Sequence, residues 1–349
     1  MAKGPRRLKA QGERPKAHGK AVRMTARQRR VSVLLFACAL TLQLSVAGAV
    51  QPIPTSRQIA LTFDDLPYVR VASSYLPAAQ RVTSDILKTL ARHRAPAIGF
   101  VNEVQLQGPE RDARIALLRQ WIDHGHSLGN HTYSHPDFNT VSIERFQEEI
   151  VQGETVTREL MQARLRSSGG NAARLFFRHP MTHTGDTKEK KEAIEKFLAD
   201  RGYTIAPHTI ENSDFIFNRV YAQARAKSDN ALATKVRDTY LEHTMGATTF
   251  AEAISPKIFN REIPQTLLLH ANDITADSLD ELLTRYESRG YRFITLEQAM
   301  ADPAYKTPDT LVSSFGPTWF WRWTKTLGVK VSGAGDPEVP PWVIELFNR

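Results

Sequence analysis

Short apolar runs alternate with helical patterns along most of this chain, and this alternation constrains its fold more than any other feature. Seven short apolar runs are candidate strands, and they span residues 58–63, 97–102, 127–131, 174–178, 203–207, 266–271 and 291–295. Between the runs, apolar residues recur every three or four positions, as in Val82, Ile86 and Leu90, a spacing typical of amphipathic helices. The alternation predicts βαβ units and a mostly parallel sheet in an α/β fold, arranged as either a barrel or a doubly wound sheet.

Polar residues and glycines mark several of the predicted helix ends. Thr295 and Gln298 have the spacing of a capping box, and Gly202 and Gly290 stand where helix C-caps are expected. Residues 218–262 predict two successive helices with no strand between them. The alternation of strands and helices therefore lapses in that segment.

The formal charge of +9 is concentrated in the first 30 residues, which hold eleven Lys or Arg and one acidic residue. The remaining 35 basic and 36 acidic residues nearly cancel. A nucleic-acid groove would require a basic surface on the folded body of the protein. We therefore expect no nucleic-acid partner.

An uncharged apolar run at residues 31–50 follows this basic segment and ends in the small residues 47–49. The combination predicts an export signal within residues 1–49, cleaved to leave a mature chain that begins near Val50. Export would place the protein in the periplasm or outside the cell. The membrane would be contacted only through this segment.

Three other interpretations of the N-terminal segment stay open. An apolar run of this length can serve as an uncleaved membrane anchor, Arg29-Arg30 resembles a twin-arginine signal, and Met24 offers a later start. The only cysteine, Cys38, lies inside the apolar run. A mature chain without it would have no disulfide and no thiol chemistry.

Residues capable of chemistry follow the predicted strands at their carboxyl ends: Asp64, Asp65, His131, Arg178 and His270. The carboxyl ends of parallel strands are where α/β folds place their active sites. The positions of these residues thus predict a functional site at one edge of the sheet.

His131 and His135 stand four residues apart, which on a helix or tight turn directs both rings to one side. With Asp65 they would form a set of two imidazoles and one carboxylate that leaves a coordination position open for water. Adjacent strand residues point to opposite faces, so Asp64 and Asp65 can take different roles in one site. The alternative is that the two aspartates only cap a turn into residues 66–68.

Five segments occur in an order that resembles the NodB-homology polysaccharide deacetylases, carbohydrate esterase family 4. They read TFDD, HTYSH, FRHP, NSDF and LLLH, and the resemblance covers roughly residues 57–300. It implies a distorted (β/α) barrel with fewer than eight strands. It also implies that the two histidines and the aspartate of the predicted site bind one divalent ion, zinc, with cobalt or nickel as alternatives.

The resemblance also implies roles for the other motif residues. Asp64 matches the family's general base, and Arg178 matches the arginine that holds this base. His270 matches the catalytic histidine that protonates the leaving group, and Asp214 matches the acid that orients it. The chemistry implied is hydrolysis of an acetyl group.

Two motifs depart from the usual pattern at positions implied to contact substrate. Pro180 is followed by Met181, where the family usually has an aromatic residue after proline. In the family the main-chain N–H at this position helps to bind the oxyanion, and methionine retains that N–H. Phe215 stands where tryptophan is more usual, so it can line an acetyl pocket without an indole donor.

Four of the five tryptophans lie in residues 304–349, beyond the predicted deacetylase domain of residues 50–303. Trp319 and Trp323 fall on one helical face. We expect this C-terminal extension to pack on the barrel and cover an open side. A sugar-binding platform is the alternative.

These observations favour a metal-dependent hydrolase that removes acetyl groups from an N- or O-acetylated polysaccharide or oligosaccharide. We expect a monomer whose partner is an acetylated glycan. A catalytically silent glycan-binding protein and a small-molecule amidase or esterase on the same scaffold are the alternative functions.

Overall fold

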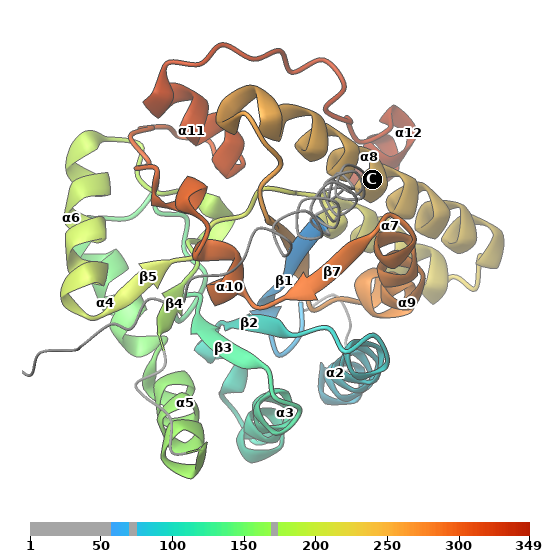
Figure 1. The fold of residues 1–349 in the computed structure, drawn as a ribbon. Coiled ribbons are helices and arrows are strands. Elements are labelled where there is room, and N and C mark those ends of the chain that lie inside the picture. The colour runs from blue at the N-terminus through green and yellow to red at the C-terminus, as the bar shows by residue number, and fades with distance from the viewer. Residues whose placement is uncertain (1–56, 70–74, 169–173) are drawn as a thin grey trace, which may run out of the picture. The chain divides into compact units, whose positions relative to one another are not determined.

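The computed structural model describes residues 57–69, 75–168 and 174–349, and in this part of the chain helices lie around a parallel sheet (Figure 1). The predicted export segment, residues 1–49, lies outside the described residues. The strands are β1 (Arg57–Leu66), β2 (Ala97–Val101), β3 (Ser127–Asn130), β4 (Leu175–Phe177), β5 (Tyr203–Ile205), β6 (Gln265–His270) and β7 (Tyr291–Ile294). Each predicted run overlaps one of these strands, so the predicted α/β fold is confirmed.

Strand β1 is the centre of the sheet because it pairs with three neighbours. The strand order is β5-β4-β3-β2-β1-β6, and β7 pairs with the first residues of β1. After β5, Ile210 forms a single parallel bridge with Leu267 of β6. This bridge brings the chain after β5 next to β6, but β5 and β6 do not pair along a continuous ladder. The described strands thus form a distorted, incompletely closed (β/α) barrel of seven strands, as the resemblance implies.

The parallel register gathers the candidate catalytic residues at one edge of the sheet. Asp64 of β1 is level with His270 at the end of β6. His131 directly follows β3, and Arg178 directly follows β4. Because parallel strands end at the same edge, residues far apart in the sequence meet there.

The helices agree with the sequence pattern. They are α2 (Tyr75–Arg92), η1 (Glu103–Leu106), α3 (Arg111–Asp123), α4 (Ile143–Gln152), α5 (Thr155–Ser168), η2 (Pro180–Thr182), α6 (Lys188–Asp200), α7 (Asp214–Ala226), α8 (Asn230–Phe259), α9 (Asp273–Ser288), α10 (Leu296–Met300), η3 (Pro303–Lys306), α11 (Trp319–Leu327) and α12 (Pro341–Phe347). No strand separates α7 from α8, and Thr295 with Gln298 forms the predicted capping box. Of the helices in the described ranges, none has the length and apolarity needed to cross a bilayer.

Apolar packing fixes β1, and hence the two aspartates at its end. Phe63 is fully buried and contacts Trp121 of α3 edge to face, with ring centroids 5.3 Å apart. Val82, Ile86 and Leu90, the predicted apolar stripe of α2, are all 0% exposed. Burial of one such side chain stabilises a fold by roughly 1.5–3 kcal/mol. A close-packed core therefore fixes the strand that carries Asp64 and Asp65.

The C-terminal extension contacts the long helices that follow β5. Helix α11 packs against α8, and α12 packs against α7. Trp319 and Trp323 are 7% and 1% exposed, so the helical face predicted from their spacing is buried. Neither ring is available as an exposed sugar platform.

Gly153, at the end of α4, lies against the loop that follows β3. A Cβ atom there would stand 2.4 Å from the carbonyl carbon of Thr132 and 2.6 Å from the nitrogen of Tyr133. We predict that Gly153→Ala lowers the free energy of unfolding by about 1–3 kcal/mol, because backbone atoms must move to admit the methyl group. Chemical denaturation would measure this change.

Gly246→Ala is the matched control for this substitution. Gly246 lies inside α8, and the nearest atom to its added Cβ would be the Pro337 side chain at 3.4 Å. Alanine in a helix interior is favoured over glycine by up to about 1 kcal/mol, so this variant should be neutral or more stable. Equal destabilisation by the two changes would contradict the close approach described at Gly153.

Candidate active site and metal centre

Asp65, His131 and His135 converge at the carboxyl edge of the sheet. The Oδ1 atom of Asp65 lies 3.6 Å from Nε2 of His131 and 3.6 Å from Nε2 of His135. One ligand atom from each residue lies within 4.8 Å of the other two. The two histidines are brought together by a turn, in which Thr132 and His135 have φ angles of 68° and 61°, and not by a helix.

The three donor atoms form a candidate site for a divalent ion. Asp65 Oδ1 is buried, and no described residue donates a hydrogen bond to it. Nδ1 of His131 lies 2.7 Å from the carbonyl oxygen of Arg178; when Nδ1 carries the proton, Nε2 presents its lone pair toward Asp65. Burial, followed by the charge of His135, holds the pKa of His131 well below its usual range. His131 is therefore a neutral imidazole, the form that binds metal.

The loop that carries His135 is supported from α4. Glu149 is fully buried, and its carboxylate accepts hydrogen bonds from the Ser134 nitrogen at 2.7 Å and from the Ser134 hydroxyl at 2.8 Å. Its backbone carbonyl accepts a hydrogen bond from the Tyr133 nitrogen at 3.0 Å. These bonds position His135. Its backbone has the left-handed conformation, which must be held by the surrounding structure.

Asp64 is 2% exposed and faces both the metal site and Arg178. Its Oδ2 lies 3.8 Å from Nε2 of His131 and 3.9 Å from Nη1 of Arg178. Burial raises the pKa of Asp64, and the guanidinium of Arg178 partly opposes this effect. A carboxylate with a raised pKa is suited to accept a proton near neutral pH.

Asp214 and His270 form a second charged pair. Nδ1 of His270 donates to Asp214 Oδ1 at 2.5 Å, and the His270 backbone nitrogen donates to Oδ2 at 2.7 Å. Asn272 and Thr275 also donate to Oδ2, at 3.2 and 3.0 Å. Burial lowers the pKa of His270, but the charge and hydrogen bond of Asp214 outweigh burial and raise the pKa to about 10. His270 is therefore an imidazolium whose Nε2 proton is free to be donated.

These groups meet in a cavity of about 600 Å³. Seven of the predicted site residues line it, namely Asp64, Asp65, His131, His135, Met181, Phe215 and His270. The other three, Pro180, Arg178 and Asp214, are buried. Arg178 and Asp214 contact the residues that line the cavity.

The same cavity contains residues that the sequence did not single out as site residues. They are Thr182, Glu211, Ser213, Leu268, Gly316, Pro317, Thr318, Trp321 and Asp336. Burial raises the pKa of Glu211, against the hydrogen bond that it accepts from the Ser213 nitrogen. Four of these residues come from the segment between η3 and α11 or from α11 itself, which no motif connects to the site.

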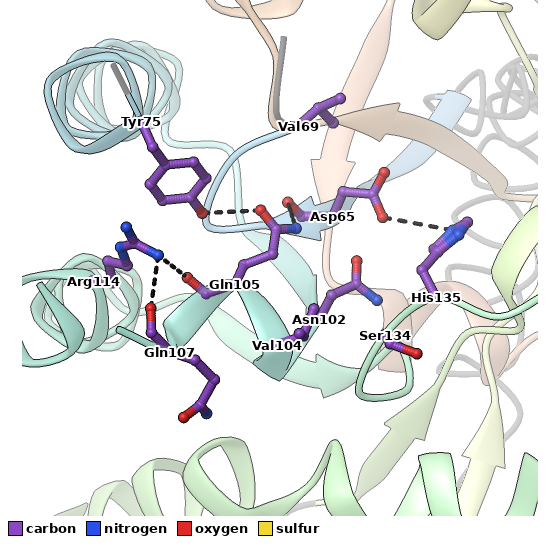
Figure 2. A pocket seen from close by; sticks show the side chains of 10 residues that line it. All are labelled: Asp65, Val69, Tyr75, Asn102, Val104, Gln105, Gln107, Arg114, Ser134 and His135. Carbon is purple, nitrogen blue, oxygen red and sulfur yellow. Dashed lines mark hydrogen bonds and ion pairs between the residues drawn. The ribbon is translucent and has the colours of Figure 1, made fainter. Parts of the chain in front are cut away.

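A second cavity, of about 420 Å³, shares Asp65 and His135 with the first (Figure 2). Gln105 donates from Nε2 to the backbone oxygen of Asp65 at 3.3 Å and accepts from the Tyr75 hydroxyl at 2.9 Å. The guanidinium of Arg114 lies 4.4 Å from the centre of the Tyr75 ring and donates to the Gln105 carbonyl at 3.0 Å. This polar cluster holds the backbone of Asp65, whose φ of 64° also lies in the left-handed region.

Comparison with known proteins finds similarity to polysaccharide deacetylases. Residues 52–187 match the family model described as polysaccharide deacetylase. The chain is 25% identical over 247 residues to the peptidoglycan-N-acetylglucosamine deacetylase PgdA of Listeria monocytogenes, which covers 70% of this chain and 39% of that protein. It is 37% identical over 94 residues to the chitooligosaccharide deacetylase of Rhizobium leguminosarum bv. trifolii, which covers 27% of this chain and 36% of that protein. This chain is thus matched to less than half the length of either relative.

A solved structure to which this chain is similar is the Bc1960 peptidoglycan N-acetylglucosamine deacetylase in complex with an N-hydroxybenzamide compound. It is 19% identical in sequence, with a TM-score of 0.47, and the match covers 70% of this chain and 88% of that one.

The pairing of Asp214 with His270 generates a test by titration. We predict that Asp214→Asn lowers the pKa of His270, because it removes the charge and hydrogen bond that do most to oppose burial, while Asp65 and Asp64 still raise the pKa. The ring protons of His270 would be followed by NMR in metal-free protein. The wild-type ring should stay charged above pH 7 and lose its proton near its pKa of about 10, whereas the variant ring should lose its proton at a clearly lower pH.

Asp137→Asn is the control for this titration, because Asp137 is paired with a different histidine, His183, at 2.7 Å. It should leave the His270 titration unchanged. A His270 pKa that is the same in wild type and in Asp214→Asn would refute the role given to Asp214.

Proposed function

We propose that this protein is an exported, metal-dependent hydrolase that removes acetyl groups from an N- or O-acetylated polysaccharide or oligosaccharide. One observation supports the proposal above all. A possible metal site, a buried carboxylate and a histidine-aspartate pair face a single cavity of about 600 Å³. The match of residues 52–187 to the polysaccharide deacetylase family model supports the same reaction class.

Asp65, His131 and His135 would hold the divalent ion. Bound there, the ion supplies Lewis-acid polarisation of the acetyl carbonyl and of water. Two imidazoles and one carboxylate suit zinc first, with cobalt and nickel as alternatives.

The protein's own groups would move the protons. Asp64 accepts a proton from the water that attacks the acetyl carbon, and Arg178 keeps the Asp64 carboxylate oriented. His270 then donates its Nε2 proton to the departing nitrogen or oxygen, while Asp214 stabilises the imidazolium. The main-chain N–H of Met181 is the proposed donor to the oxyanion of the tetrahedral intermediate.

The substrate class is supported by the relatives' names. The Listeria relative is named for N-acetylglucosamine in peptidoglycan, and the rhizobial relative for chitooligosaccharides. An N-acetylglucosamine-containing glycan is therefore the first substrate to test. The basic and apolar N-terminal segment supports export to the periplasm or medium, where such glycans occur.

The proposal predicts different defects for the two adjacent aspartates. Asp64→Asn should retain the metal yet reduce turnover about 10²–10⁴-fold, the usual range for a lost general base. Asp65→Asn should instead reduce the metal content, because it removes a ligand. Acetate release from a panel of acetylated glycans and an aryl acetate, together with metal analysis, would measure both effects.

Asp112→Asn is the control, because this aspartate is fully exposed on α3 and should affect neither quantity. Equal metal content in the Asp64 and Asp65 variants, or full activity after chelation, would disprove the assigned roles. Glycan binding without acetate release would indicate a silent glycan-binding protein. Turnover of the aryl acetate alone would indicate a small-molecule esterase.

A further inference from the structure

We propose that Trp321, in the C-terminal extension, is a substrate-binding residue that stacks against a sugar ring of the glycan. The inference rests on the proposed function and extends it to the part of the substrate beyond the acetyl group. It also assigns the extension a role in the active site in addition to covering the barrel.

Trp321 lies on the side of α11 that faces the cavity. It lines the cavity that contains Asp65 and His270, and it is partly exposed. Its neighbours Trp319 and Trp323 are buried in the core at 7% and 1% exposure. Of the three closely spaced tryptophans, Trp321 is therefore the one that can contact a substrate in the cavity.

The indole of Trp321 is held in a defined orientation. Its ring stacks on Phe250 of α8, with centroids 6.1 Å apart and an interplanar angle of 29°. Asp336 lines the same cavity, where burial raises the pKa of its carboxyl and Trp321 opposes this effect. A fixed aromatic surface beside a polar group suits a sugar, which has an apolar C–H face and hydroxyl edges.

The rest of the cavity wall is complementary to such a ligand. Met181 and Phe215 are 49% and 47% exposed, although large apolar side chains are usually buried. Both line the cavity with Trp321. An open apolar wall next to a set of catalytic groups is what a bound sugar would cover.

The extension is anchored to the third-motif turn by a buried arginine. Arg322 is fully buried; its Nη2 donates to the Thr182 carbonyl at 2.8 Å, and its Nη1 donates to the Thr184 hydroxyl at 2.8 Å. Asp309 accepts a further bond from Nη1 at 2.9 Å, which pairs the buried charge. The residue next to Trp321 therefore connects α11 directly to the active-site loop.

A close backbone approach strengthens this anchor. The Thr182 hydroxyl donates to the Gly316 carbonyl at 2.6 Å. A Cβ atom on Gly316 would lie 2.0 Å from Thr182 Oγ1 and 2.1 Å from the Met181 oxygen, so only glycine fits. Met181 and Thr182 have φ angles of 52° and 55°, a conformation that costs about 1–2 kcal/mol per residue and needs support from its surroundings. The extension provides that support.

The test compares an oligosaccharide with a substrate that is too small to reach Trp321. Trp321→Ala should lower kcat/KM for an N-acetylglucosamine pentasaccharide about tenfold or more, mainly through KM, because a ground-state contact is lost. The kcat/KM for 4-nitrophenyl acetate should change less than about threefold. Trp321→Phe should recover part of the loss, since it keeps an aromatic face.

Trp342→Ala is the matched control. Trp342 is also a partly buried tryptophan of the extension, but it lies on α12 beneath Lys235, whose Nζ is 4.2 Å from the ring centroid. It is absent from the residues that line the described cavity. Both substrates should be processed normally by this variant.

Gly316→Ala provides a second, independent variant. It should displace the extension from the Met181–Thr182 turn and so lower kcat for both substrates, while the unfolding temperature reports whether the fold persists. Equal losses on both substrates for Trp321→Ala, or no loss on the pentasaccharide, would overturn the inference.

A binding measurement separates this inference from the proposed function. The affinity of the pentasaccharide for wild type, Trp321→Ala and Trp342→Ala would be measured by calorimetry. If wild type released no acetate but bound the pentasaccharide in a Trp321-dependent manner, the function would fail and the inference would stand. Binding that is absent, or that does not depend on Trp321, would overturn the inference whatever the outcome of the activity assay.

Discussion

The buried guanidinium of Arg178 is the interaction on which the rest of the site depends. Its side chain is 0% exposed, and it lies 3.9 Å from Asp64 and 3.0 Å from the Thr62 hydroxyl, with the Phe100 ring centroid at 5.0 Å. Its backbone oxygen accepts the hydrogen bond that orients His131. One residue therefore positions both the candidate base and a candidate metal ligand. A charge at this depth is tolerated only beside an opposite charge, and Asp64 of β1 provides that charge.

Most of the fold, and the meeting of most candidate site residues at one edge of the sheet, could be predicted from the sequence because both depend on local or repeated patterns. The seven strands were recognisable from the alternation of short apolar runs with helical patterns, and parallel strands must bring Asp64, His131 and His270 to one edge. The motif order narrowed a general α/β pattern to a distorted barrel with fewer than eight strands. The pairing of β7 with β1 was not predictable, because strand order depends on tertiary packing and not on composition.

The residues that the sequence did not reveal reach the site through long-range contacts. Gln105 acts through the backbone of Asp65, and Trp321 arrives from α11, some 140 residues beyond the third motif. The spacing of the tryptophans places Trp319 and Trp323 on one helical face, and both side chains are buried. The spacing of the tryptophans does not indicate which residues the opposite face of the helix contacts. The left-handed turn at Met181 and Thr182 was equally hidden, because neither residue type favours that conformation.

We propose that Asp65 binds a metal ion while its neighbour Asp64 does not. Anomalous diffraction at the zinc edge from crystals of the zinc-loaded protein would show which of the two aspartates is the ligand. We expect one peak bonded to a carboxylate oxygen of Asp65 and to Nε2 of His131 and His135, at about 2.0–2.2 Å. A peak bonded to Asp64 in place of Asp65, or a peak only at an unrelated pair such as Asp137 and His183, would contradict it.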